Sequence, residues 1–151
     1  MSKLTVAIAD DNERMLRLLG EIVTKDENLQ MVGTAKDGEE AYELIKNKQP
    51  DVVLLDIVMP KLDGLGVMDM VNRDVSIRKH PSFVMISAIG QEQIMEAAFA
   101  RGASYYIMKP FSNEMVLNRI KSLRDVSKVT ETKVVNPYEK VEQKPEKSLE
   151  E

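Results

Sequence analysis

Apolar and polar positions divide the chain into short apolar runs separated by longer stretches with helical spacing. The runs with the length of strands lie at residues 4–9, 30–35, 52–56, 83–87 and 105–108. They lack polar alternation, which is typical of strands whose two faces are both covered by helices. The order of strands and helices therefore predicts an α/β fold, a doubly wound five-stranded parallel sheet, and it excludes a sandwich or a helical bundle.

The stretches between the runs carry apolar residues at the spacing of one helix face. In the first stretch the residues that share this face are Met15, Leu18, Leu19, Ile22 and Val23. Pro50 is expected to end the second helix, and Gly102 is placed to cap the fourth in a left-handed conformation. The third and fifth helices are expected to begin near Gly64 and Ser112.

Composition excludes several kinds of protein. The chain has 151 residues, of which 43% are hydrophobic, enough for one domain with a core. It has no cysteine, which excludes disulfides and zinc-thiolate sites, and its one histidine, His80, lies in a polar stretch typical of a loop. The net charge of −4 gives this chain no electrostatic reason to bind nucleic acid by itself. Because it shows neither a signal region nor an apolar run of roughly 20 residues, we expect a cytoplasmic protein without membrane contact.

The sequence changes in texture near its end. From about residue 125, lysine and glutamate dominate and large apolar residues become sparse, so the segment lacks the surface to offset its ordering entropy. We therefore expect a folded domain over residues 1–126 and a flexible linker or tail over residues 127–151.

Polar side chains stand where four of the apolar runs stop. Asp10 and Asp11 follow the first run, Asp56 ends the third, Ser87 ends the fourth, and Lys109 follows the fifth. Because ligands bind beyond the carboxyl ends of the strands in an open parallel sheet, these side chains are expected to converge there. Each could alone be a cap, a turn or a surface residue, but their joint placement favours one site.

The expected site needs a cation. A like-charge pair about 4 Å apart costs about 4 kcal/mol at an effective dielectric of about 20. Mg²⁺, or Mn²⁺ or Ca²⁺ in its place, would neutralise the carboxylates. We expect Asp11 and Asp56 as direct ligands, Asp10 through water, and the backbone carbonyl of Val58 as a further ligand. Asp56 could then act as a nucleophile toward phosphorus and form an aspartyl phosphate, with Lys109 and Ser87 binding the phosphoryl oxygens.

These motifs resemble the receiver domain of bacterial two-component response regulators over about residues 3–126. The resemblance is carried by Asp10-Asp11, by Asp56 with the loop Met59-Pro60 to Asp63-Gly64, by Ser87-Ala88, and by Lys109-Pro110-Phe111. It implies a flavodoxin-like (βα)5 fold with strand order 2-1-3-4-5, a cis peptide before Pro110, and a switch made by Ser87 and Tyr106. The implied donor is a histidine kinase or histidine phosphotransferase, since the chain has no Walker-type ATP-binding loop. The implied module accepts a phosphoryl group and is not a turnover enzyme.

A closer resemblance is to the receivers of sporulation transcription factors of endospore-forming bacteria. It is carried by residues 6–12, 63–65, 90–92 and 102–105. That family continues into a helical DNA-binding domain, so we expect this chain to be cut before such a domain and to reach DNA only through it. A homodimer is a further form that this resemblance suggests.

The residues argue against two other functions and leave two alternatives open. A phosphohydrolase resembling the haloacid dehalogenase family would need a second acid two residues after its nucleophile, where this chain has Val58. A flavodoxin-like electron carrier would need a Ser/Thr/Gly-rich phosphate-binding loop after the first strand, and this sequence has none there. A phosphate-independent protein-binding module and a stand-alone phosphorelay intermediate are the alternatives that the sequence leaves open.

Overall fold

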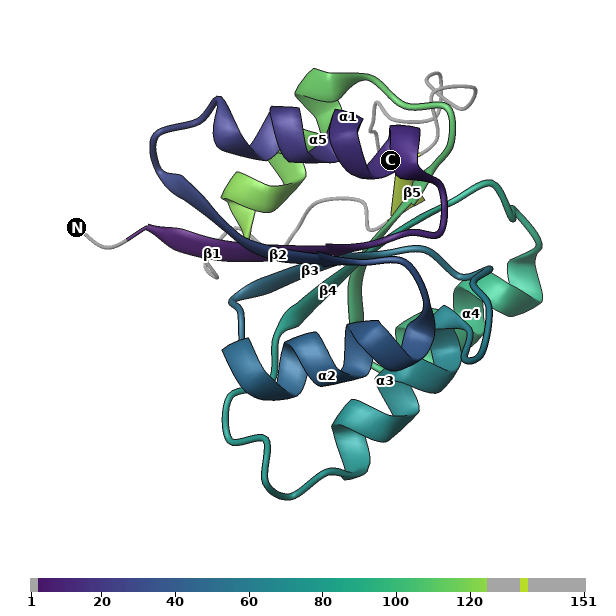
Figure 1. Cartoon of the computed structure of the whole chain (residues 1–151). Coiled ribbons are helices and arrows are strands. Elements are labelled where there is room, and N and C mark those ends of the chain that lie inside the picture. The colour runs from purple at the N-terminus through teal and green to yellow at the C-terminus, as the bar shows by residue number, and fades with distance from the viewer. Residues whose placement is uncertain (1–2, 125–133, 136–151) are drawn as a thin grey trace, which may run out of the picture.

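The computed structural model describes residues 3–124 and 134–135. Strands and helices alternate along the first of these ranges (Figure 1). The strands are β1 (Leu4–Ala9), β2 (Leu29–Ala35), β3 (Val52–Leu55), β4 (Ser82–Ser87), β5 (Ala103–Met108) and the short β6 (Val134–Val135). The helices are α1 (Glu13–Thr24), α2 (Gly38–Lys48), α3 (Gly64–Arg73), α4 (Glu92–Ala100) and α5 (Asn113–Ser122).

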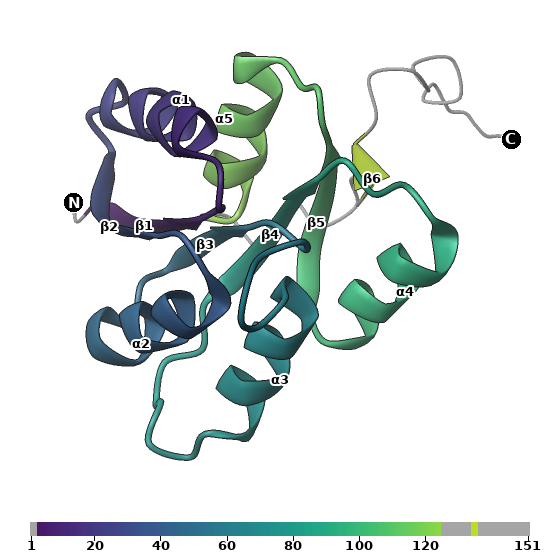
Figure 2. The ribbon, with the colours of Figure 1, turned by 45° about the vertical axis from the view of Figure 1, so that its right-hand side comes forward.

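All the strands lie in one parallel sheet. Its order is β2-β1-β3-β4-β5-β6, so the first five strands have the order expected from the sequence. The sixth strand was not expected: it comes from the tail and pairs with β5 at the sheet edge (Figure 2). The rest of the predicted tail, including residues 127–133 and 136–151, lies outside the described residues.

Helices cover both faces of the sheet, as the unbroken apolar runs predicted. Helices α1 and α5 lie on one face, and α2, α3 and α4 lie on the other (Figure 1). Successive strand residues point to opposite faces, which divides the core in two: Val6 and Ile8 pack toward α1 and α5, whereas Ala7 and Ala9 pack toward the other layer. The helices leave the ends of the strands uncovered, and polar side chains can gather there.

The helix boundaries follow the local signals closely. The side chains of four residues that precede helices accept hydrogen bonds from helix amides, which supplies the N-caps Asn12, Asp37, Asp63 and Ser112. Gly102 follows α4 with φ of 104°, as its expected capping role requires. The stripe expected in α1 is shifted: Leu16 is buried, whereas Met15 and Leu18 are only half-buried.

Helix α4 is attached to α3 at its C-terminal end. The Arg101 guanidinium Nε lies 3.0 Å from Asp69 Oδ1, and its Nη1 donates to the Ala97 carbonyl over 2.9 Å. Asn72 Nδ2 donates to the Arg101 carbonyl over 3.0 Å. The N-terminal end of α4 differs, because Gln91 makes no side-chain capping bond there. No helix in the described part of the chain has the length and apolar character needed to cross a membrane.

Candidate functional site

Two buried aspartates are fixed at the carboxyl end of the sheet by their own backbones. The Asp10 amide donates to the Ala35 carbonyl of β2, and the Asp56 amide donates to the Ala9 carbonyl of β1, each over 3.0 Å. The sheet ladder thus extends one residue past β1 and β3, and it holds both side chains at the same edge. Asp10 is 1% exposed and Asp56 is 7% exposed.

Asp11 completes a group of three carboxylates. One carboxylate oxygen of each of Asp10, Asp11 and Asp56 lies within 4.8 Å of the others. Asp11 is exposed, in contrast to its two buried neighbours. The structure therefore brings together the three acids that the sequence predicted as a metal site.

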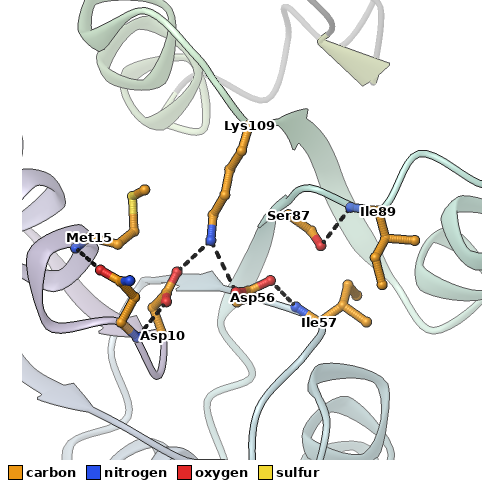
Figure 3. A network of polar contacts seen from close by, with 8 residues as sticks. Asp10, Met15, Asp56, Ile57, Ser87, Ile89 and Lys109 are labelled. Atoms are coloured by element: carbon orange, nitrogen blue, oxygen red, sulfur yellow. Dashed lines mark hydrogen bonds and ion pairs between the residues drawn. The ribbon is translucent and has the colours of Figure 1, made fainter.

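Lys109 joins the two buried acids. Its Nζ lies 2.9 Å from Asp10 Oδ2 and 3.1 Å from Asp56 Oδ2 (Figure 3). Its backbone amide donates to the Ser87 carbonyl over 2.9 Å, which continues the β4–β5 ladder and aims the side chain across the strand ends. The Lys109-Pro110 peptide is cis, as the resemblance implied.

The charges in this group shift one another's protonation. Burial opposes the ammonium of Lys109, but the hydrogen bonds and charges of Asp10 and Asp56 outweigh it and raise the pKa of Lys109 above its ordinary value. Burial raises the pKa of Asp56, and the nearby lysine offsets this only in part. The two carboxylates thus favour the charged ammonium of Lys109, whereas burial disfavours the charged carboxylate of Asp56.

The remaining Asp56 contacts come from the loop that follows β3. The Ile57 amide donates to Asp56 Oδ1 over 2.6 Å, while Oδ2 is the atom that Lys109 binds. Gly64 lies directly against this backbone: its amide donates to the Ile57 carbonyl over 2.7 Å, and a Cβ on it would lie 2.2 Å from the Asp56 carbonyl oxygen. The first residue of α3 therefore has no room for a side chain.

Ser87 and Tyr106 meet at the backbone of Ile89. The Ile89 amide donates to Ser87 Oγ over 3.2 Å, and the Tyr106 hydroxyl donates to the Ile89 carbonyl over 2.6 Å. Both side chains are buried, Ser87 at 1% exposed and Tyr106 at 0%. Burial raises the pKa of Tyr106. The sequence analysis did not identify Ile89. Its contacts are made by backbone atoms and depend on the path of the loop after β4, so its residue type gives no signal.

Val58 is the remaining residue that the sequence predicted for the metal site. It lies in the loop between β3 and α3, and it is 57% exposed. The use of its carbonyl as a metal ligand stays a prediction.

The donor set fits a hard divalent cation. Mg²⁺ binds oxygen ligands at about 2.1 Å, which separates its ligand oxygens by about 3–4 Å. Carboxylate oxygens already within 4.8 Å of one another need only a small approach to reach that geometry. Soft metals are disfavoured, since these three side chains offer only oxygen atoms.

Comparison with known proteins agrees with this description. The strand order and the acidic strand-end site define a receiver-type α/β domain, and residues 6–121 match the response regulator receiver domain family. The chain belongs to that family. Receiver domains are phosphoryl-accepting signalling modules that bind Mg²⁺ at an acidic aspartate pocket and interact with histidine kinases or phosphotransferases.

Solved structures resemble the chain over most of its length. CheY of Borrelia burgdorferi, in a complex with CheX, BeF3 and Mg, is 35% identical with a TM-score of 0.73, and the match covers 82% of this chain and 90% of that one. The signal receiver domain of a response regulator designated NarL from Mycobacterium tuberculosis is 28% identical with a TM-score of 0.75, covering 83% and 99%. The response regulator domain of Thermotoga maritima CheB is 28% identical with a TM-score of 0.70, covering 81% and 94%.

Proposed function

We propose that Asp56 accepts a phosphoryl group from a phosphohistidine on a histidine kinase or histidine phosphotransferase. The observation that carries this proposal is the placement of Asp56 between Lys109, 3.1 Å from its Oδ2, and two further carboxylates at the end of a parallel sheet. Asp10 is held by the Asn12 amide and by Lys109, and Asp56 is held in the same way, with Oδ1 on the Ile57 amide and Oδ2 on Lys109. The Asp56 carboxylate is thereby oriented before a donor arrives.

The transfer needs no cofactor besides the metal. An Asp56 carboxylate oxygen attacks the phosphorus, the new O–P bond forms as the P–N bond breaks, and the donor imidazole leaves with the electron pair and is protonated. Asp10 and Asp11, with the Val58 carbonyl, would hold Mg²⁺ beside Asp56. When bound, Mg²⁺ supplies positive charge to the phosphoryl oxygens. The Borrelia burgdorferi relative was solved with BeF3 and Mg, which supports this part of the proposal.

Lys109 has a second task in this proposal. Before transfer it neutralises Asp10 and Asp56, and after transfer its ammonium binds a phosphoryl oxygen. The Ser87 hydroxyl, now an acceptor for the Ile89 amide, would turn to donate to another phosphoryl oxygen. Because Tyr106 is bonded to the same Ile89 backbone, a movement of Ser87 bears directly on the loop that Tyr106 holds.

The output is the finer part of the proposal. We propose that the chain is the receiver of a regulator similar to stage zero sporulation protein A, and that phosphorylation controls dimerisation and DNA binding by a domain beyond residue 151. Residues 6–12, 63–65, 90–92 and 102–105 support this by sequence resemblance. Residues 1–126 would be the receiver and residues 127–151 the linker.

The test is intact mass after incubation with Mg²⁺ and acetyl phosphate. A mass gain of one phosphoryl group is expected for the wild type, and none for Asp56→Ala. Asp51→Asn, which changes an acid at the opposite end of β3, is the matched control and should still gain the group. An absent gain in a folded wild type that binds Mg²⁺ would contradict the proposal and favour a phosphate-independent binding module.

A further inference from the structure

The β5 edge of the sheet carries an additional strand from the same chain. Strand β6 pairs with β5 in parallel, with Val134 opposite Tyr106 and Val135 opposite Ile107. In Figure 2 it lies beside β5, between α4 and α5. An uncovered edge strand presents a row of unpaired amides and carbonyls, which is a surface for another extended segment.

The pairing falls on the part of β5 that serves the site. Tyr106 is paired with Met85 of β4 on one side and with Val134 on the other, while its hydroxyl holds the Ile89 carbonyl. Lys109, which binds both buried acids, follows Ile107 by two residues. The added strand thus supports β5 at the residues that lead from the tyrosine to the lysine.

The length of the connection favours the chain's own segment over a second copy. Nine residues, 125–133, join Arg124 to Val134. A short tether gives its end an effective concentration on the order of millimolar. A second copy of the chain at micromolar concentration would compete about a thousandfold less well for the same edge.

From this geometry we infer that the β5 edge is a docking surface for a parallel extended segment and that its occupant is residues 134–135 of the same chain. We further infer that docking is linked to the inward position of Tyr106, in which the ring is buried and the hydroxyl donates to the Ile89 carbonyl. The link is reciprocal: whatever favours the inward tyrosine favours the docked strand by the same factor. Residues 134–135, which follow the receiver domain in the chain, thereby bind to that domain as an intramolecular ligand. The docking goes beyond phosphoryl acceptance and does not depend on it, whereas the test of the link to Tyr106 rests on the proposed function.

Hydrogen–deuterium exchange of the full 151-residue chain tests the docking. Proline cannot donate a ladder hydrogen bond, so a variant with Val134→Pro and Val135→Pro should lose the strand, whereas Val134→Thr with Val135→Thr should keep it. The β5 peptide, residues 103–108, should exchange about fivefold faster in the proline variant, the factor that corresponds to about 1 kcal/mol for one net hydrogen bond. Strand β2 at the other edge should not change.

Two results would overturn the docking. One is equal exchange of β5 in the proline and threonine variants. The other is protection of β5 that rises with protein concentration together with a dimer in light scattering, because a second copy would then be the occupant. Unchanged protection over a wide concentration range, with a monomer mass, supports docking within one chain.

The link to Tyr106 is tested with the same variants after treatment with Mg²⁺ and acetyl phosphate. If the phosphoryl group favours the inward tyrosine, β5 exchange should slow in the threonine variant but not in the proline variant. An equal response in both would overturn the link. Intact mass distinguishes this from failure of the proposed function, since an unphosphorylated sample would show no mass gain while the comparison without acetyl phosphate still decides the docking.

Discussion

Lys109 shows how one side chain can serve two buried acids. Its side chain is only 19% exposed, and its ammonium lies near 3 Å from oxygens of Asp10 and Asp56, so solvent screens these contacts much less than it screens a surface pair. The surface pair of Lys36 and Glu13, at 3.5 Å with side chains 57% and 66% exposed, is the natural comparison within the chain. The two lysines should therefore differ sharply in what their removal costs.

Lys109→Met should lower the free energy of unfolding by roughly 2 kcal/mol, because two carboxylates lose a charged hydrogen-bond partner. Lys36→Met should change it by less than about 0.5 kcal/mol. Urea unfolding measures both changes. Added Mg²⁺ should stabilise Lys109→Met more than it stabilises the wild type. Equal losses for the two lysines would contradict the buried role of Lys109.

Asp74 is a second residue whose charge matters, far from the site. It accepts hydrogen bonds from the Ser76 hydroxyl over 2.6 Å, from the Ser76 amide and from the Tyr42 hydroxyl, and Lys46 lies 3.9 Å away. The bond from Ser76 is the main reason that the pKa of Asp74 falls to about 2 from 3.8. The network ties the end of α3 to α2.

A lowered pKa fixes the sign of the pH dependence. The charged Asp74 stabilises the fold above pH 3.8, and this contribution is lost as the pH falls toward about 2. Asp74→Asn should therefore be less stable than the wild type near neutral pH, and the gap should narrow between these two pH values. Denaturant midpoints across this range measure the effect, and parallel curves for the two proteins would rule it out.

At the scale of elements, two glycines should respond in opposite ways to substitution by alanine. Gly64 begins α3 against the Asp56 backbone, where a Cβ would lie 2.2 Å from a carbonyl oxygen. Gly20 lies inside α1, where a Cβ would be 3.1 Å from the flexible end of Met31. The contact at Gly64 cannot be relieved without moving the loop, whereas at Gly20 the flexible end of Met31 can move away.

Gly64→Ala should destabilise the fold by roughly 1–3 kcal/mol, as overpacking does, and should slow acceptance of the phosphoryl group because the Asp56 loop is displaced. Gly20→Ala should stabilise by roughly 0.5–1 kcal/mol, because glycine inside a helix is entropically costly. Thermal unfolding and the rate of mass gain with acetyl phosphate measure both effects. A Gly64→Ala protein with wild-type rate and stability would refute the close packing.

The elements were predictable where one local signal decides them. Strand positions came within a residue or two because fully covered strands are continuous apolar runs, and caps such as Asp63 and Ser112 are set by their own side chains. The parallel strand order then predicted that Asp10, Asp56 and Lys109 lie together at the carboxyl ends of the strands. The contact of Tyr106 with Ile89 and the pairing of Val134 depend on loop paths and tertiary pairing, which no short pattern encodes.

At the scale of the whole molecule, the acidic site should make stability depend on the metal. A ligand that binds only the folded state stabilises it by about 2.7 kcal/mol at a hundred times its dissociation constant. The melting temperature should therefore rise with Mg²⁺ concentration. Asp11→Asn, which removes an exposed member of the site, should abolish most of the rise.

Glu39→Gln is the control for this prediction. It removes an exposed acid in the first turn of α2, outside the three-carboxylate group, so it should keep the full response to Mg²⁺. Isothermal titration calorimetry should give the same ranking as the melting temperatures. An equal response in both variants would mean that Mg²⁺ stabilises by general charge screening.

The two ends of α4 are held differently, so the helix can pivot about its C-terminal end. Arg101 fixes the far end of this helix to α3, whereas the near end follows Gly90 and the Ile89 carbonyl without a side-chain cap. Nine residues of helix make an arm of about 13 Å. A displacement of about 1 Å at the Ile89 end then turns the arm by about 4° around its pivot. Movement that begins at Asp56 would be passed on as a rotation of α4 about its Arg101 end, and the displacement would be greatest at the end nearest the site.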